Sequence, residues 1–235
     1  MLFGEQPREW TGTSLDTVRA IEKFIRLAFA ASDRSRDAKL KYVYQSYGVW
    51  AEGLLRSMDE LEQSRYAAKQ YASLVRHARV DEFTPEEKLN YYRHVYYDKN
   101  AYIRVFALLD KLGTLLNELL ELKTERMKAH FSFFTVLRNM RLNRLHAELM
   151  TPLNELKEQH KESFNRLRSR RNTEIHHMNA ELQDDLRTML PHQGEWRQLE
   201  DLKANMADLD RAWDTIEATL GHSFRYACKQ IGQTH

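Results

Sequence analysis

Hydrophobic residues recur at steps of three and four along most of the chain, which is the spacing of one face of an α-helix. The stripes predict helices over residues 14–31, 37–80 (with possible breaks), 86–122, 125–149, 152–190 and 195–231. The 235 residues include only 8 Gly and 4 Pro, too few for the tight connections of an all-β or α/β protein. The pattern therefore predicts an all-α antiparallel helical bundle.

Three local signals place boundaries between these helices. Thr84, Pro85 and Glu87 combine an N-cap, a proline at the first helical position and a capping-box acid, so a helix is expected to begin there. The Thr151–Pro152 pair predicts another helix start, and residues 191–194 predict a turn.

Two stripes are unusual. The stripe of the 152–190 helix includes Arg171 at a position that otherwise carries hydrophobic side chains. The last helix has strict alternation of three and four at Leu199, Leu202, Met206, Leu209, Trp213, Ile216 and Leu220. Such a seam requires a partner helix. Because this seam and the 152–190 helix present more apolar surface than one small bundle easily covers, we expect a homodimer.

Composition bounds the class of protein. With 42% hydrophobic and 30% charged residues, the chain is expected to form one all-α domain over 13–235, after a poorly ordered tail at 1–12. A net charge of +2 means that any basic surface must be local. No secretion signal, no membrane-length apolar run and a single cysteine, Cys228, favour a cytoplasmic protein without disulfides.

The densest basic run lies at residues 163–177 and contains a pair of histidines. Arg171 is followed by Asn172 and, after four intervening residues, by His176; His177 is the alternative partner at a gap of five. The same spacing occurs by chance from Arg141 and Arg187 to later histidines. The polar residue after Arg171, its hydrophobic-type position and its basic flank distinguish it from those matches.

Arg171, Asn172 and His176 resemble the R-x(4-6)-H motif of the HEPN superfamily, whose members are all-α bundles. The resemblance also rests on the long helical hairpin expected between Asp98 and Leu149 ahead of the motif. It implies a HEPN-like core at about 96–235, with additional helices at 13–95 that it does not cover.

The resemblance implies a function as well. In catalytic HEPN members the motif lies at a dimer interface and forms a metal-independent ribonuclease site, with no cofactor. His176 would move protons and Arg171 would stabilise the phosphorane, leaving a 2′,3′-cyclic phosphate on single-stranded RNA. Asn172 would cap the helix that presents His176 or hold its imidazole, and Arg170 and Arg168 would contact flanking phosphates. A toxin or defence effector with a separately encoded antitoxin or partner protein would fit.

Other interpretations stay open at this stage. The chain could be a catalytically silent HEPN-like module that binds RNA or a protein partner. Arg171 could instead pair with a buried carboxylate as a purely structural feature. Glu174 and His177 form one E-x-x-H pair, but a di-iron bundle needs two, so a metal-binding bundle is the remotest interpretation. Met178 stands where AMP-transferring or tyrosine-modified members carry a tyrosine, so that subclass is not expected.

Overall fold

The computed structural model describes residues 9–77, 82–176 and 201–233, and every regular element in them is a helix. The all-α prediction is confirmed. The elements in chain order are α1 (Gly12–Arg34), α2 (Ala38–Ser73), α3 (Pro85–Leu119), the 3₁₀ turn η2 (Thr124–Arg126), α4 (Phe133–Leu142), α5 (Ala147–Gln159), α6 (Lys161–His176) and α8 (Leu202–Gln233).

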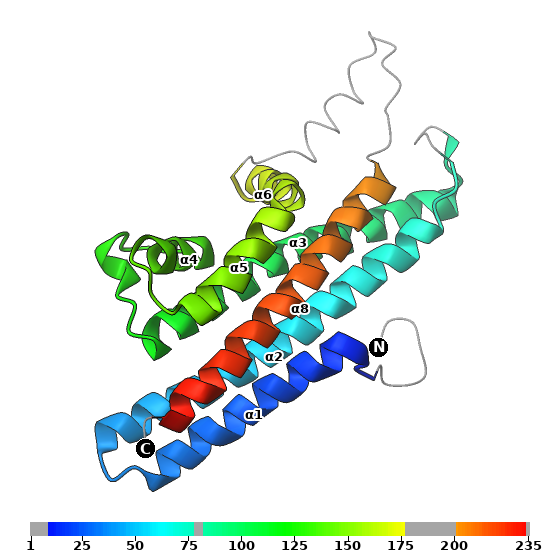
Figure 1. Ribbon diagram of the computed structural model, residues 1–235. Helices are drawn as coiled ribbons and strands as arrows, with labels where there is room; N and C mark the ends of the chain where they lie inside the picture. The colour runs from blue at the N-terminus through cyan, green and yellow to red at the C-terminus, as the bar shows by residue number, and fades with distance from the viewer. Residues whose placement is uncertain (1–8, 78–81, 177–200, 234–235) are drawn as a thin grey trace.

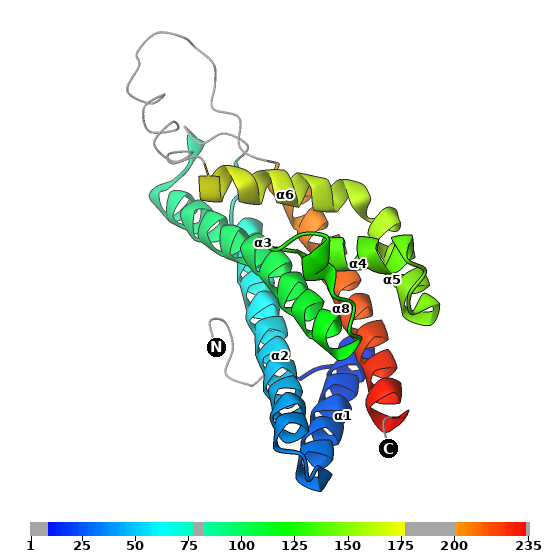
Figure 2. The same ribbon diagram turned by 90° about the vertical axis from the view of Figure 1, so that its left-hand side faces the viewer.

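Four long helices, α1, α2, α3 and α8, lie along the length of the molecule (Figure 1). The helix α8 packs against α1, α2, α3, α5 and α6, so it occupies the centre of the bundle. The shorter α4 and α5 lie to one side, and α6 lies across α3, as the turned view shows (Figure 2). None of the helices in the described ranges is long and apolar enough to cross a membrane.

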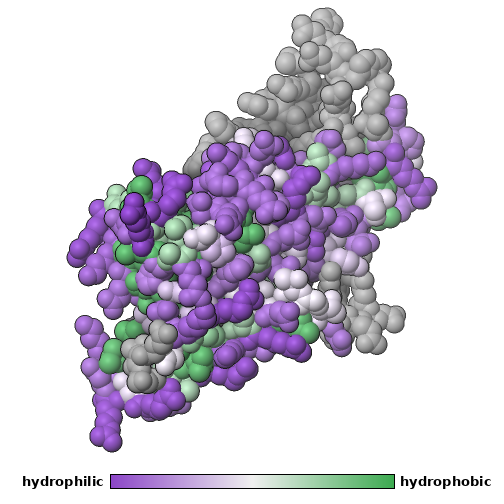
Figure 3. Space-filling view, viewed as in Figure 1, coloured by the Kyte–Doolittle hydropathy of each residue, from purple (hydrophilic) through white to green (hydrophobic). Residues whose placement is uncertain are grey.

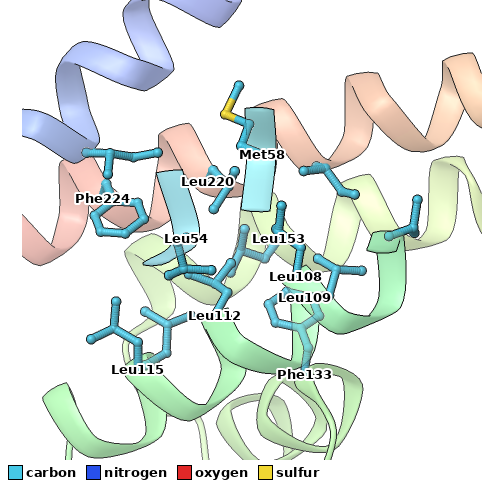
Figure 4. Close-up of a cluster of buried hydrophobic side chains, with 14 of the residues drawn as sticks. Leu54, Met58, Leu108, Leu109, Leu112, Leu115, Phe133, Leu153, Leu220 and Phe224 are labelled. Carbon is cyan, nitrogen blue, oxygen red and sulfur yellow. The ribbon is translucent and has the colours of Figure 1, made fainter. Parts of the chain in front are cut away.

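The core is a single cluster of aliphatic and aromatic side chains from most of the helices (Figure 4). Leu54 and Met58 of α2, Leu112 of α3 and Leu220 of α8 are each at most 1% exposed. The outer face seen in Figure 3 is mainly hydrophilic, with hydrophobic groups in small patches between hydrophilic ones. Burial of this kind stabilises by about 25 cal/mol per Å² of apolar surface and is the main force that holds the bundle together.

The seam of the last helix is buried inside the protomer. All of its described members are buried, and one turn beyond Leu220 the same helix meets α1, where the rings of Phe24 and Phe224 pack edge to face at 5.3 Å. The partner helix that the seam requires is therefore supplied by the same chain. This finding removes the seam as an argument for a dimer, although the dimer itself remains a prediction.

The predicted start at Thr84 is confirmed in detail. Its hydroxyl accepts the N–H of Glu87, the Glu87 carboxylate accepts the N–H of Thr84, and Pro85 is the first helical residue. The Glu87 carboxylate also accepts the N–H groups of Arg76 and His77. These bonds hold the connection from α2 in a non-helical conformation, so α2 ends at Ser73 rather than continuing toward Val80 as predicted.

The predicted single helix over 125–149 is wrong. The chain instead forms η2, a loop, α4, a turn and the start of α5. Buried amides satisfy the backbone of the first connection: Asn117 Oδ1 accepts the N–H of Thr124 at 2.9 Å, and Asn139 Nδ2 donates to the Leu122 carbonyl at 2.9 Å. Left-handed backbone at Glu121, Lys123, Arg144 and His146 turns the chain at both connections.

The predicted single helix over 152–190 is also wrong. The helix α5 already begins at Ala147, so Pro152 lies inside it rather than at its start, and the chain breaks at His160 before α6. The helix α6 then runs to His176, and α8 begins at Leu202. Leu182, Leu186, Met189, the 191–194 turn and the predicted helix start at Glu195 lie outside the described residues.

Most of the predicted 1–12 tail also lies outside the described residues. In the described part of this tail, the ring of Trp10 stacks parallel to the ring of Trp213, with 6.1 Å between the two centroids. The helix α1 begins directly after this contact, at Gly12.

Candidate active site on the basic helix α6

The helix α6 runs back over α3 in the opposite direction, so that the end of α6 meets the first half of α3 (Figure 2). The facing side of α3 carries Asp98, Tyr102, Phe106 and Asp110 at intervals of four residues, which places them in one row along the helix. Three arginines of the basic run, Arg168, Arg170 and Arg171, contact this row, whereas Arg166 pairs with Asp208 of α8. Sequence reasoning identified the arginines but not the row that receives them.

Arg171 lies over a buried aromatic ring. Its guanidinium carbon is 5.1 Å from the centroid of Phe106, which is 4% exposed. Its Nε is buried without a hydrogen-bond partner, and no carboxylate in the described part of the chain forms an ion pair with it. A guanidinium that lies over a ring and has no carboxylate partner keeps hydrogen-bonding capacity for an anion.

Arg170 makes the buried ion pair that was considered for Arg171. Its Nη2 donates to the carboxylate of Asp98, which is 2% exposed, and its guanidinium carbon lies 4.8 Å from the Tyr102 centroid. The purely structural ion pair that the sequence left open for Arg171 is therefore made by Arg170. A phosphate contact by Arg170 remains a prediction, and any phosphate that it binds would compete with Asp98.

Arg168 completes the set of stacked arginines. Its guanidinium carbon lies 4.9 Å from the Phe134 centroid and 5.9 Å from that of Phe106. Phe164, from the first turns of α6, packs edge to face against both of these rings. The aromatic cluster thus holds two arginines side by side while α6 crosses α3.

Asp110 is, with Asp98, an acidic group of this site that sequence reasoning missed. Its carboxylate accepts the backbone N–H of Phe133 at 3.0 Å and so anchors the start of α4. The pKa of Asp110 is raised, because the effect of burial outweighs the bond from Phe133 and the charges of Arg171 and Arg168, which lower it. In the sequence, Asp110 stands four residues after Phe106 and so shares a face of α3 with it. That spacing indicates a site residue only once α6 is known to pack on this face of α3.

Asn172 lies in the last turns of α6, and His176 ends the helix. Asn172 is exposed and sits inside the helix, so the predicted capping role is wrong; the contact to an imidazole stays a prediction. His176 is the last residue of α6, and its side chain and all of His177 lie outside the described residues.

Glu174, the acid of the single E-x-x-H pair, forms an ion pair with Lys99 of α3 at 3.0 Å. Within the described ranges, His, Cys, Asp and Glu side chains nowhere gather in groups of three or more that could hold a metal ion.

A scan against protein-family models gives the context for this helix. The model of the Cthe2314-like HEPN family matches residues 50–228, a span that begins in α2 and includes α6 and most of α8. The chain belongs to this HEPN family. The match includes Arg171, Asn172 and His176, which carried the sequence resemblance. Searches of curated proteins and of solved structures found no significant match.

Membership places the arginine cluster in a HEPN domain, a module of the nuclease, RNA-related or toxin type. The match starts closer to the N-terminus than the core expected at about 96–235, because it takes in much of α2.

Proposed function

We propose that this HEPN protein is a metal-independent endoribonuclease that cleaves single-stranded RNA and leaves a 2′,3′-cyclic phosphate. One observation carries the proposal. In a HEPN domain, the motif arginine Arg171 is held on Phe106 without a carboxylate partner in the described part of the chain, while the adjacent Arg170 takes the buried Asp98. A purely structural arginine would be expected to bond the acid itself.

The proposed reaction is an internal transesterification. The imidazole of His176 accepts the proton of the 2′-hydroxyl, whose oxygen then bonds to the adjacent phosphorus. The bond from phosphorus to the 5′-oxygen breaks, and His176 of the partner subunit donates a proton to that leaving oxygen. Histidine suits both steps because its pKa lies near neutrality. Arg171 stabilises the extra negative charge of the phosphorane between the two steps.

The neighbouring groups position the substrate in this proposal. Arg168 and Arg170 contact flanking phosphates, although Asp98 neutralises part of the charge of Arg170. Asn172 holds the imidazole by a hydrogen bond. His177 takes the role of His176 if it is the imidazole that faces the site.

The proposed reaction uses a homodimer because it needs two imidazoles at one phosphate, one that accepts a proton and one that donates it. Each chain contributes one His176, so a second copy of α6 supplies the second imidazole. Ile175, beside His176, is 53% exposed and offers an apolar contact for that second copy.

The test is cleavage of end-labelled single-stranded RNA by purified protein in excess EDTA, with analysis of the product ends. Arg171→Ala and His176→Ala should each lower cleavage by about two orders of magnitude or more, because each removes a group that acts in the transition state. Helicity and dimerisation should not change. The matched control is His192→Ala, the histidine of a chance match, which should leave cleavage unchanged.

Three other results would change the proposal. Cleavage that disappears with EDTA indicates a metal-dependent enzyme. A wild type that binds RNA but does not cut it, with Arg171→Ala behaving alike, supports the silent RNA-binding module. Cleavage that persists in His176→Ala and stops in His177→Ala reassigns the proton-transfer role. A small gene encoding an antitoxin beside this one would favour a toxin or defence effector.

A further inference from the structure

A second basic site lies away from α6, in an open groove between α1 and α8. The groove has a volume of about 720 Å³ and is lined by Asp16, Arg19, Ala20, Lys23, Arg225, Cys228 and Lys229. The two helices run side by side along the molecule, as Figure 1 shows, and Phe24 and Phe224 lock them together. The groove is therefore built on rigid elements rather than on loops.

The charge of the groove is strongly one-sided. Arg19 and Lys23 stand one turn apart on α1, and Arg225 and Lys229 stand one turn apart on α8, so two basic rows face one another. Asp16 is the one acid in the lining, and Glu148 of α5 pairs with Lys229. Among the described residues, no ion pair reaches the other three cations. Their mutual repulsion is relieved when an anion binds between them.

The lining also indicates which anion. It contains no aromatic ring on which a base could stack and no side-chain amide that could read one. Its polar groups are guanidinium and ammonium groups, which suit phosphate oxygens. Because the groove is open along two helices, it suits a chain of phosphates better than an enclosed ligand.

We propose that the α1–α8 groove binds the phosphodiester backbone of single-stranded RNA. This inference rests on the proposed function, since it takes RNA to be the substrate. The groove anchors the strand without reading its sequence, while α6 carries the chemistry. An anchor of this kind would make binding strongly dependent on salt.

The only cysteine of the chain provides a reporter inside the groove. Cys228 is half-buried, and its Sγ lies 3.9 Å from the Ala20 carbonyl. Burial raises the pKa of this thiol, with Lys23 and Arg26 acting in the opposite sense. A strand in the groove would cover the sulfur, so its rate of alkylation reports occupancy directly.

The first experiment measures binding of a fluorescent oligouridine with 2′-O-methyl groups, which cannot form a cyclic phosphate and so separates binding from cleavage. The variant Arg19→Glu/Lys23→Glu should bind at least about tenfold more weakly at low salt. Its slope of log affinity against log salt should be shallower by about 1.4, because each lost phosphate contact is worth about 0.7 on a single strand. The control Arg56→Glu/Lys128→Glu makes the same charge change on exposed residues outside the groove.

The second experiment follows alkylation of Cys228 by iodoacetamide, a neutral reagent. The same oligonucleotide at saturation should slow alkylation at least about fivefold, whereas UMP at equal phosphate concentration should not. Equal losses of affinity in the groove variant and the control, or no protection of the thiol by bound oligonucleotide, would overturn the proposal. Equal protection by UMP would replace RNA with a small phosphate ligand.

The two proposals fail separately. Protection of Cys228 without cleavage of natural RNA leaves the groove intact and removes the ribonuclease. Cleavage of natural RNA without protection of Cys228 leaves the ribonuclease intact and removes the groove as its RNA anchor.

Discussion

At the scale of single residues, neighbouring arginines on α6 have different physical roles. Arg170 balances a buried carboxylate, whereas Arg171 rests on a ring and keeps hydrogen-bonding capacity. A buried charge that loses its partner is costly, while a cation on an aromatic face contributes little to folding. Substitution of Arg170 should therefore mainly lower stability, whereas substitution of Arg171 should mainly lower activity.

We expect Arg170→Ala to lower the free energy of unfolding by about 3 to 5 kcal/mol, because it removes the cation that balances Asp98. Arg171→Ala should cost about 1 kcal/mol, the loss of one stacked cation. Urea unfolding monitored by circular dichroism measures both. If Arg171→Ala is the more destabilising change, Arg171 is structural and the site assignment is wrong.

Phe106 is expected to position Arg171 for catalysis. Phe106→Leu keeps most of the core volume but removes the face on which Arg171 and Arg168 lie, so kcat should fall about tenfold or more. Phe24→Leu, in the fully buried α1–α8 contact, should cost similar stability, about 1 kcal/mol, without lowering kcat. Equal kcat values in the two variants would remove the positioning role.

At the scale of elements, the α3–α4 contact depends on a glycine. A Cβ added at Gly113 would lie 2.8 Å from the Cα of Phe133, which is backbone and cannot rotate away. The close contact between α3 and the start of α4 also lets the Asp110 carboxylate accept the backbone N–H of Phe133. The absence of a side chain at Gly113 therefore brings α4, with Phe134, close enough to complete the ring cluster under Arg168.

Gly113→Ala should lower the free energy of unfolding by about 1 to 3 kcal/mol, because overpacking outweighs the better helix propensity of alanine. The control is Gly53→Ala, where the nearest atom is the end of the Arg56 side chain at 3.9 Å. That change should stabilise by about 0.5 to 1 kcal/mol. Denaturant midpoints compare the two, and a stabilising Gly113→Ala would show that α3 and α4 can separate.

The α2–α3 connection should give the fold a dependence on acid pH. Hydrogen bonds from the Thr84, Arg76 and His77 backbone and from the His77 ring lower the pKa of Glu87 to about 2 from an ordinary value of 4.5. Because the folded-state pKa is the lower one, the stabilisation is complete above pH 4.5 and is lost as the pH falls toward 2.

The measurement is Tm against pH for wild type and Glu87→Gln. The gap between the two curves should be widest above pH 4.5 and should narrow toward pH 2. Glu86→Gln, at the exposed neighbouring position, is the control and should follow the wild type. A gap that stays constant with pH would mean that the Glu87 charge does not stabilise the connection.

At the scale of the whole molecule, the proposed chemistry needs two copies of the chain. The buried seam of α8 no longer argues for association, so the case rests on the two copies of His176 that the proposed reaction uses. Sedimentation equilibrium at micromolar concentration should show a dimer.

Mixing wild type with His176→Ala tests whether the site is shared. After subunit exchange with a fourfold excess of the variant, a fixed amount of wild type should retain about one fifth of its activity, because random pairing places most wild-type chains in mixed dimers. Unchanged activity would show that each protomer cleaves alone. A control mixture with His192→Ala should show no loss.

The sequence by itself determined the helical class, the capping box at Thr84 and the basic helix with Arg171, because these depend on periodicity and on contacts within a few residues. It could not set the break near Glu121, where Asn139 bonds the Leu122 carbonyl, or the break at His160, beyond which α6 packs on α3. Only the tertiary structure decided that Asp98 pairs with Arg170, that Phe106 carries Arg171, and that α1 and α8 form a basic groove. Each of these joins residues far apart in the chain, and local patterns carry no information about which distant faces will meet.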